Sequence, residues 1–199
     1  MFAARPRLRI APRLNSQEDN VQKITVKSVC LIAVALSALM TSVFATGAQG
    51  GKVNVKADTL TGYQETPTIS STGTGTFTAE IDEDAGVITY ELTYSGLSSS
   101  AVAAHIHFGG RYLAGSVTAF LCGGPKPACP AGITSEAVVT GTITAADILG
   151  IPAQGITAGD IASIIQAIRS GVTYVNVHTP SHPGGEIRGQ VNDEDQRQP

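Results

Sequence analysis

Alternation of apolar and polar residues dominates the chain from about residue 51 onward. In the segment 75–81 every second side chain is apolar, and the same pattern resumes over 88–94. A period of two is that of a half-buried β-strand. The acidic turn Asp82-Glu83-Asp84-Ala85-Gly86 separates the two segments, so together they predict a β-hairpin.

Six further segments share this pattern, and Gly, Pro, Asp or Ser residues bound them: Val53–Leu60, Val102–Phe108, Ser116–Leu121, Glu136–Ile143, Thr173–Thr179 and Glu186–Val191. With the hairpin they make eight short strand candidates. This number and length favour a mostly β fold, an antiparallel β-sandwich or Greek-key-like barrel around one core.

One segment changes to helical spacing. Isoleucines recur at 161, 164, 165 and 168, and Gly171 follows as a C-terminal stop. Thr157 stands three residues before Asp160 in a loose capping box, and Thr144 precedes Asp147 in the same way. We expect one short helix, starting near Ile161, that covers an open end or edge of the sheets.

The first 45 residues are typical of an export signal. Lys23 and Lys27 precede the apolar run 29–40, and small or apolar residues end at Ala45. The run is shorter than the ~18 residues that a membrane span requires, so we expect membrane contact only if this segment stays uncleaved. The remainder divides into a linker at 46–51, a domain at 52–192 and a polar tail at 193–199.

Charge excludes one class of partner. The whole chain carries a formal net charge of -3, and without the leader 7 basic residues face 14 acidic ones, a net of -7. An acidic domain is repelled by phosphate backbones, which argues against nucleic-acid binding.

Two cysteines remain after the leader. Cys122 and Cys129 enclose Gly-Gly-Pro-Lys-Pro-Ala, and Gly and Pro at these positions favour a tight reversal. The reversal brings the two sulfurs together, which predicts a disulfide in an oxidising compartment. A thiolate metal site is the alternative.

The candidate chemistry lies in two short motifs that contain all four histidines, His105, His107, His178 and His182. The two-residue period places His105 and His107 on one strand face. It likewise groups the polar residues of two later strands, listed here in order: Tyr174, Asn176 and His178 on one, and Glu186, Arg188 and Gln190 on the other. If these three strands are neighbours, they form one polar patch that faces outward from the core.

Two interpretations of this patch stay open. In the first, His105, His107 and His178 supply three imidazoles to copper or zinc, with His182 as a fourth ligand on a bendable loop. The residues that would orient the imidazoles are then Tyr174, Asn176, Glu186 and Arg188. In the second, the histidines hydrogen-bond to polar neighbours and hold adjacent strands in register.

The segments 104–109, 173–179 and 185–191 resemble the signature of the CHRD domain, first described in chordin and present in exported microbial proteins. The opening Leu60–Pro67 is similar to that family too, and the resemblance spans Lys52 to Asn192. It implies an extracellular, β-sandwich-like domain. We therefore expect an exported, non-enzymatic binding or envelope-associated module, secreted or periplasmic, with an unknown ligand. Chordin binds secreted growth factors, but its cysteine-rich modules are missing here, so that role is not carried over.

A shorter stretch, His105–Gly109, resembles the copper-ligand strand of copper/zinc superoxide dismutase. The zinc-loop histidines and their companion Asp have no counterparts in the sequence, which argues against dismutase activity. No carboxylate pair or nucleophile turn favours a hydrolase. The sequence therefore predicts a binding protein and no enzyme, with copper as the candidate metal.

The leader gives the first testable prediction. Exported protein should begin at Thr46 or within a few residues of it, because a processing peptidase would cut after Ala45. N-terminal sequencing of exported material checks this, and an amino terminus before Lys23 would contradict it.

Overall fold

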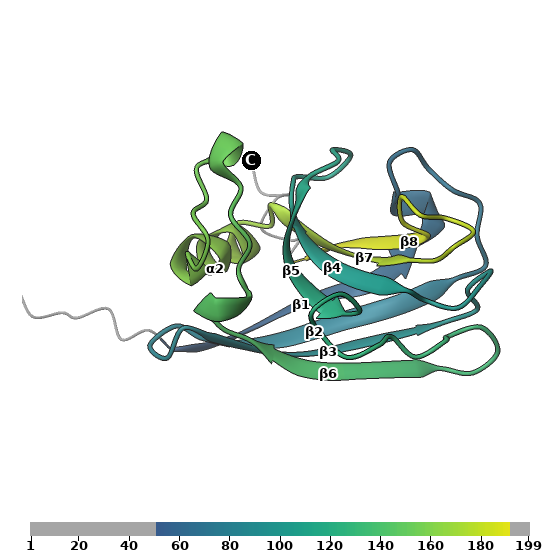
Figure 1. The fold of residues 1–199 in the computed structure, drawn as a ribbon, viewed down its shortest axis with the longest axis horizontal. Coiled ribbons are helices and arrows are strands. Elements are labelled where there is room, and N and C mark those ends of the chain that lie inside the picture. Colours follow the sequence, from purple (N-terminus) through teal and green to yellow (C-terminus); the bar gives the residue numbers. More distant parts are fainter. Residues whose placement is uncertain (1–50, 192–199) are drawn as a thin grey trace, which may run out of the picture. The chain divides into compact units, whose positions relative to one another are not determined.

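Eight antiparallel strands form a single sheet in the computed structural model, which describes residues 51–191 (Figure 1). Its order is β5-β4-β7-β8-β1-β2-β3-β6. The strands are β1 (Lys52–Thr61), β2 (Thr74–Asp82), β3 (Val87–Ser95), β4 (Ala103–Phe108), β5 (Ser116–Cys122), β6 (Ala137–Ile143), β7 (Thr173–His178) and β8 (Ile187–Val191). Each lies where a strand was predicted. The predicted leader, the tail and most of the linker lie outside the described residues.

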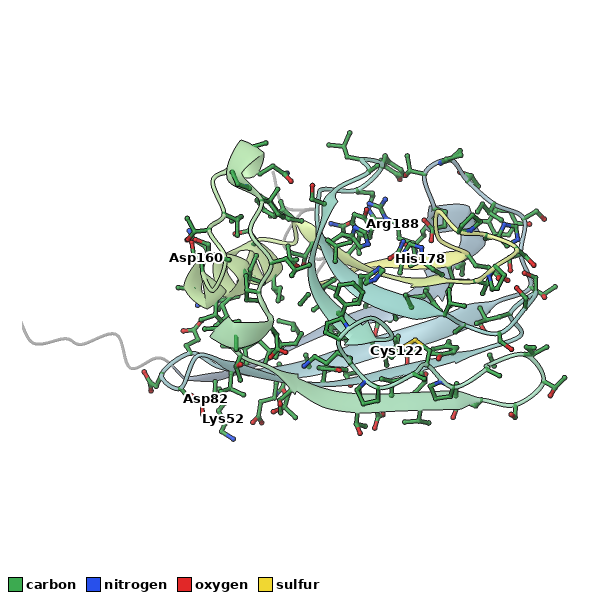
Figure 2. The ribbon with its side chains drawn as sticks, in the orientation of Figure 1. Lys52, Asp82, Cys122, Asp160, His178 and Arg188 are labelled. Carbon is green, nitrogen blue, oxygen red and sulfur yellow. A yellow bond between two sulfur atoms is a disulfide. The ribbon has the colours of Figure 1, made fainter. Side chains whose placement is uncertain are left out.

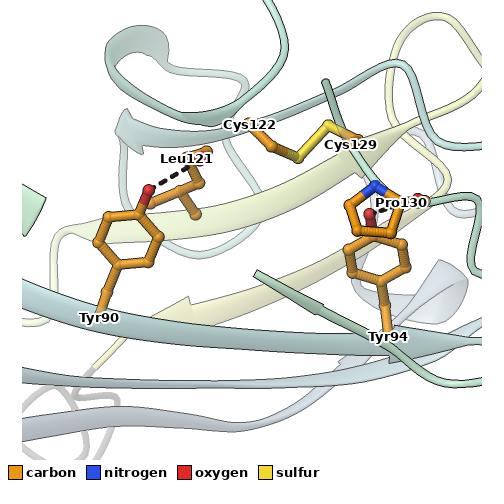
Figure 3. The surroundings of a disulfide bond; sticks show 6 residues. All are labelled: Tyr90, Tyr94, Leu121, Cys122, Cys129 and Pro130. Atoms are coloured by element: carbon orange, nitrogen blue, oxygen red, sulfur yellow. Dashed lines mark hydrogen bonds between the residues drawn. A yellow bond between two sulfur atoms is a disulfide. The ribbon is translucent and has the colours of Figure 1, made fainter. Parts of the chain in front are cut away.

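The sheet folds back on itself into two layers. Strands β1, β2, β3 and β6 form one layer, and β5, β4, β7 and β8 form the other (Figure 1). At the corner, one residue pair, Thr61 with Arg188, joins β1 to β8. On the opposite side the Tyr90 hydroxyl of β3 donates to the Leu121 carbonyl of β5 at 2.7 Å (Figure 3). The result is a nearly closed, barrel-like sheet, as the strand pattern predicted.

The apolar core fills the space between the layers, because every second residue of each strand turns inward. In β3 the four apolar residues of the predicted hairpin, at 88, 90, 92 and 94, are each at most 4% exposed. From the other layer, Ile106, Val175, Val177 and Ile187 are fully buried. Each large side chain removed from water in this way contributes about 1.5–3 kcal/mol to the free energy of folding.

One α-helix, α2 (Ile161–Arg169), lies within residues 51–191, near one end of the barrel (Figure 1). The Asp160 carboxylate caps it by accepting from the Ser163 backbone N–H at 3.0 Å. Ile164, Ile165 and Ile168 pack into the core. The second capping box produces a short 3-10 turn, η2 (Ala145–Asp147), and two others are η1 (Gly62–Gln64) and η3 (Pro152–Gln154).

Across residues 51–191 no helix has the length and apolar character that crossing a membrane requires.

Cys122 and Cys129 form the predicted disulfide, which closes the loop after β5 (Figure 3). The bond uses both thiols, so the alternative of a thiolate metal site does not apply. Next to it, the Tyr94 hydroxyl donates to the Pro130 carbonyl at 2.7 Å and fixes the loop against β3.

Removing this disulfide should weaken the fold only modestly. The cross-link stabilises the fold by restricting the unfolded chain. Because the enclosed loop is short, it adds only about 2–3 kcal/mol to the free energy of unfolding. The Cys122→Ala/Cys129→Ala variant should therefore unfold at lower urea concentration yet remain folded in water. Loss of the cooperative transition in water would contradict the prediction.

Candidate metal centre

Three neighbouring strands bring the predicted site residues together. In the β4–β7 pair, His105 lies opposite Asn176 and His107 opposite Tyr174. In the β7–β8 pair, Asn176 lies opposite Arg188. The side chains of His178 and Arg188 lie together on this layer (Figure 2). The expectation that the three strands are neighbours is confirmed.

The polar face is not an outer patch, and here the sequence prediction was wrong. His105 is 8% exposed and His107 7%, and both Asn176 and Arg188 are 2% exposed. Two segments cover this face: the β4–β5 loop at 109–115 and the β1–β2 connection at 62–73. The face does turn away from the apolar core, but it forms a second, polar interior.

Arg188 holds the cover in place. Its Nη1 donates to the Leu113 carbonyl at 3.0 Å and to the Thr66 hydroxyl at 3.4 Å, and its Nη2 donates to the Gly110 carbonyl at 3.1 Å. A buried guanidinium needs such partners because its five N–H groups have lost water. One side chain thus binds both loops that shield the site.

The histidines form a compact cluster. One ligand atom from each of His105, His107 and His178 lies within 4.8 Å of the other two. Around zinc, nitrogens at ~2.0 Å from the ion lie ~3.3 Å apart, so side-chain shifts of about 1 Å would bring the three nitrogens to a common ion.

Backbone carbonyls lie beside Nδ1 of two rings. His107 Nδ1 lies 3.0 Å from the Gly115 carbonyl oxygen, and His178 Nδ1 lies 3.0 Å from that of Pro183. A carbonyl only accepts, so Nδ1 of His107 carries the proton and its Nε2 keeps a lone pair. At His178, Asn176 Oδ1 lies 2.9 Å from Nε2 and competes with the Pro183 carbonyl for the single ring proton. An imidazole that donates its other N–H to a carbonyl has the usual arrangement of a metal ligand.

Two buried ring nitrogens lack partners. Among the described residues, His105 Nδ1 and His107 Nε2 have no hydrogen-bond partner although water cannot reach them. An unsatisfied buried polar atom costs about 1–3 kcal/mol, and a bound ion is one of the partners that would remove this cost.

Burial keeps the imidazoles neutral. It lowers the pKa of His105 to about 3, with a further contribution from the nearby His178 and His107. Burial also lowers the pKa of His107 to about 4, although the contact with the Gly115 carbonyl opposes the shift. Because only neutral imidazole binds a metal, protons compete weakly at neutral pH.

A stack of three groups holds the His107 ring in place. The His107 and Tyr174 rings are nearly parallel, with centroids 4.6 Å apart, and the Arg188 guanidinium lies 3.4 Å from the centroid of Tyr174. The Tyr174 hydroxyl accepts from the Gly115 N–H at 3.0 Å. Tyr174 therefore packs directly on His107, and Arg188 packs on the Tyr174 ring.

Glu186, by contrast, lies apart from the imidazoles. Its carboxylate accepts hydrogen bonds at 2.7–2.8 Å from the Ser71 hydroxyl, from the Ser98 amide and hydroxyl, and from the Thr179 hydroxyl. β8 begins only at Ile187, and Gly185 has a φ of +123° that ends the extended run. The two-residue period therefore does not extend to Glu186, which joins loops instead of orienting a ligand.

The predicted fourth ligand, His182, is also outside the cluster. Its backbone N–H donates to the Thr179 carbonyl at 3.1 Å in the turn between β7 and β8. The group of potential metal ligands among the described residues contains the other three histidines.

Sequence reasoning missed Glu65, which follows η1 and is 7% exposed. Burial raises its pKa to about 7, although Arg188 and the Asn176 side chain oppose the shift. Its Oε1 has no hydrogen-bond partner among the described residues. Glu65 belongs to the Leu60–Pro67 stretch that resembled the family, but strand periodicity gives no sign that this connection folds over β7.

These pKa shifts predict acid sensitivity. The folded-state pKa values of His105 and His107 lie below the ordinary value of 6.5, so the unfolded chain binds more protons as the pH falls below 6.5. Between pH 7 and pH 5 the two histidines should remove about 4 kcal/mol of stability. Glu65, with a raised pKa, works in the opposite direction over about pH 4.5–7 and should offset about half of this loss.

Urea unfolding at several pH values tests this balance. The variant His105→Gln/His107→Gln should lose the acid sensitivity that the two rings cause, because glutamine does not titrate. An equally steep loss of stability in the variant would contradict the assignment.

The CHRD domain family matches residues 57–191 of the chain. Comparison with curated proteins and with solved structures gives no match. The matched segment includes all three cluster histidines and Glu65, and it covers more than half of the 199 residues. On this evidence, and in agreement with the motifs in the sequence, the chain belongs to the CHRD domain family.

Proposed function

We propose that the protein is an exported, non-enzymatic binding module that holds one copper ion through His105, His107 and His178. The observation that carries this proposal is the pair of buried, unpartnered nitrogens, His105 Nδ1 and His107 Nε2, in a cluster of three neutral imidazoles. An ion there would replace two unsatisfied atoms by two coordinate bonds.

Copper is the first choice among metals. Imidazole suits copper, zinc and nickel, and the affinity of a nitrogen site for divalent ions is highest for copper. The buried rings also limit access by substrate, which favours binding over catalysis.

Two further observations support export. Membership of the CHRD family fits an extracellular role, and the disulfide fits an oxidising compartment. The proposed location is therefore the periplasm or the exterior, where the module would also contact an extracellular or envelope ligand.

Calorimetric titration of Cu(II) and Zn(II) into protein without a histidine tag tests metal binding. Wild type should bind one ion, with Cu(II) tighter than Zn(II). His107→Ala should lower the affinity at least 100-fold, because two imidazoles hold an ion much less firmly than three. His182→Ala is the matched control and should bind as wild type does, because its ring lies outside the cluster.

Thermal melts of the same proteins separate binding from folding. A saturating metal should raise the melting temperature of wild type and of His182→Ala, because the ion binds the folded state. No heat above dilution in wild type would remove the metal function. The histidines would then serve only to hold the strands together.

A further inference from the structure

Asn176 lies at the centre of the polar interior, beside the metal ligands proposed above. It is opposite His105 in the β4–β7 pair and two residues before His178 on β7. Its side chain is almost fully buried, and its Oδ1 lies 2.9 Å from His178 Nε2.

His178 faces an acceptor oxygen at each ring nitrogen, the Pro183 carbonyl at Nδ1 and Asn176 Oδ1 at Nε2. A neutral imidazole carries one proton, so it can donate to only one of these oxygens. An amide oxygen offers only lone pairs. When the proton is on Nδ1, Nε2 and Oδ1 both present lone pairs and repel unless a cation lies beside both, and their 2.9 Å separation is close to the ~3.3 Å between two ligands of one ion.

Glu65 fixes which way the amide points. Asn176 Nδ2 and Glu65 Oε1 both border Gly185, because a Cβ placed there would lie 2.6 Å from the first atom and 2.5 Å from the second. The NH2 group of Asn176 therefore lies on the Glu65 side of the amide, and Oδ1 lies on the His178 side.

We propose that Asn176 Oδ1 is the fourth ligand of the metal centre and that Glu65 is the positioning residue that directs it. The inference rests on the three-histidine site proposed above. The ligand set becomes three nitrogens and one oxygen. Oxygen is a hard ligand, so this set favours divalent copper or zinc over Cu(I).

Zinc titration and a crystal structure of the zinc-loaded protein test the assignment. In the crystal, Asn176 Oδ1 should lie about 2.0–2.3 Å from the zinc ion. Both Asn176→Ala and Glu65→Ala should lower zinc affinity by about 10–100-fold. Glu65→Gln should recover most of that loss, because it keeps the size of the side chain and an oxygen atom on the Asn176 Nδ2 side of Gly185.

Glu186→Gln is the matched control. It changes another buried carboxylate by the same single atom, and its hydrogen bonds go to Ser71, Ser98 and Thr179, away from the cluster. It should lower the melting temperature without changing zinc affinity. If zinc affinity depended only on the stability of the fold, it would also fall in Glu186→Gln. That result would contradict the positioning role of Glu65.

The outcomes separate the two proposals. If wild type binds no zinc or copper, the metal function itself fails. If wild type binds zinc and His107→Ala does not, but Asn176→Ala binds as wild type or Oδ1 lies beyond about 3 Å from the ion, only the fourth-ligand assignment is overturned.

Discussion

The buried guanidinium of Arg188 holds the polar face of the second layer closed. Its hydrogen bonds to Gly110, Leu113 and Thr66 join the β4–β5 loop to the β1–β2 connection, and its contact with Tyr174 supports the ring that stacks on His107. A charge is stable out of water only if its donors are used. Each of its interactions therefore positions a part of the site or of its cover.

Closing the face changes the chemistry of the groups beneath it. Removal of water lowers the histidine pKa values and leaves neutral imidazoles, and it raises the pKa of Glu65. The same removal makes unpartnered atoms costly, and His105 Nδ1 and His107 Nε2 have no partners among the described residues. A metal ion would satisfy lone pairs that converge from the two strands β4 and β7, which is the physical ground of the proposed metal function.

The spacing of apolar and polar residues predicted much of this architecture. It placed the eight strands, the helix at Ile161 and the shared face of His105, His107, Asn176 and His178, because each depends on neighbours along the chain. It did not reveal that loops cover this face, since the contacts of Arg188 with Thr66 and Leu113 span many residues. Glu65 was missed and Glu186 misplaced for a related reason. Both lie just outside regular strands, where alternation no longer tells which way a side chain points.

The most direct test is the metal content of the mature protein, purified without a tag or chelator from its native compartment and measured by elemental mass spectrometry. The account predicts close to one copper or zinc ion per chain, lost in the variant His105→Gln/His107→Gln. A wild-type protein that is free of metal, and stays so after incubation with either ion, would contradict it.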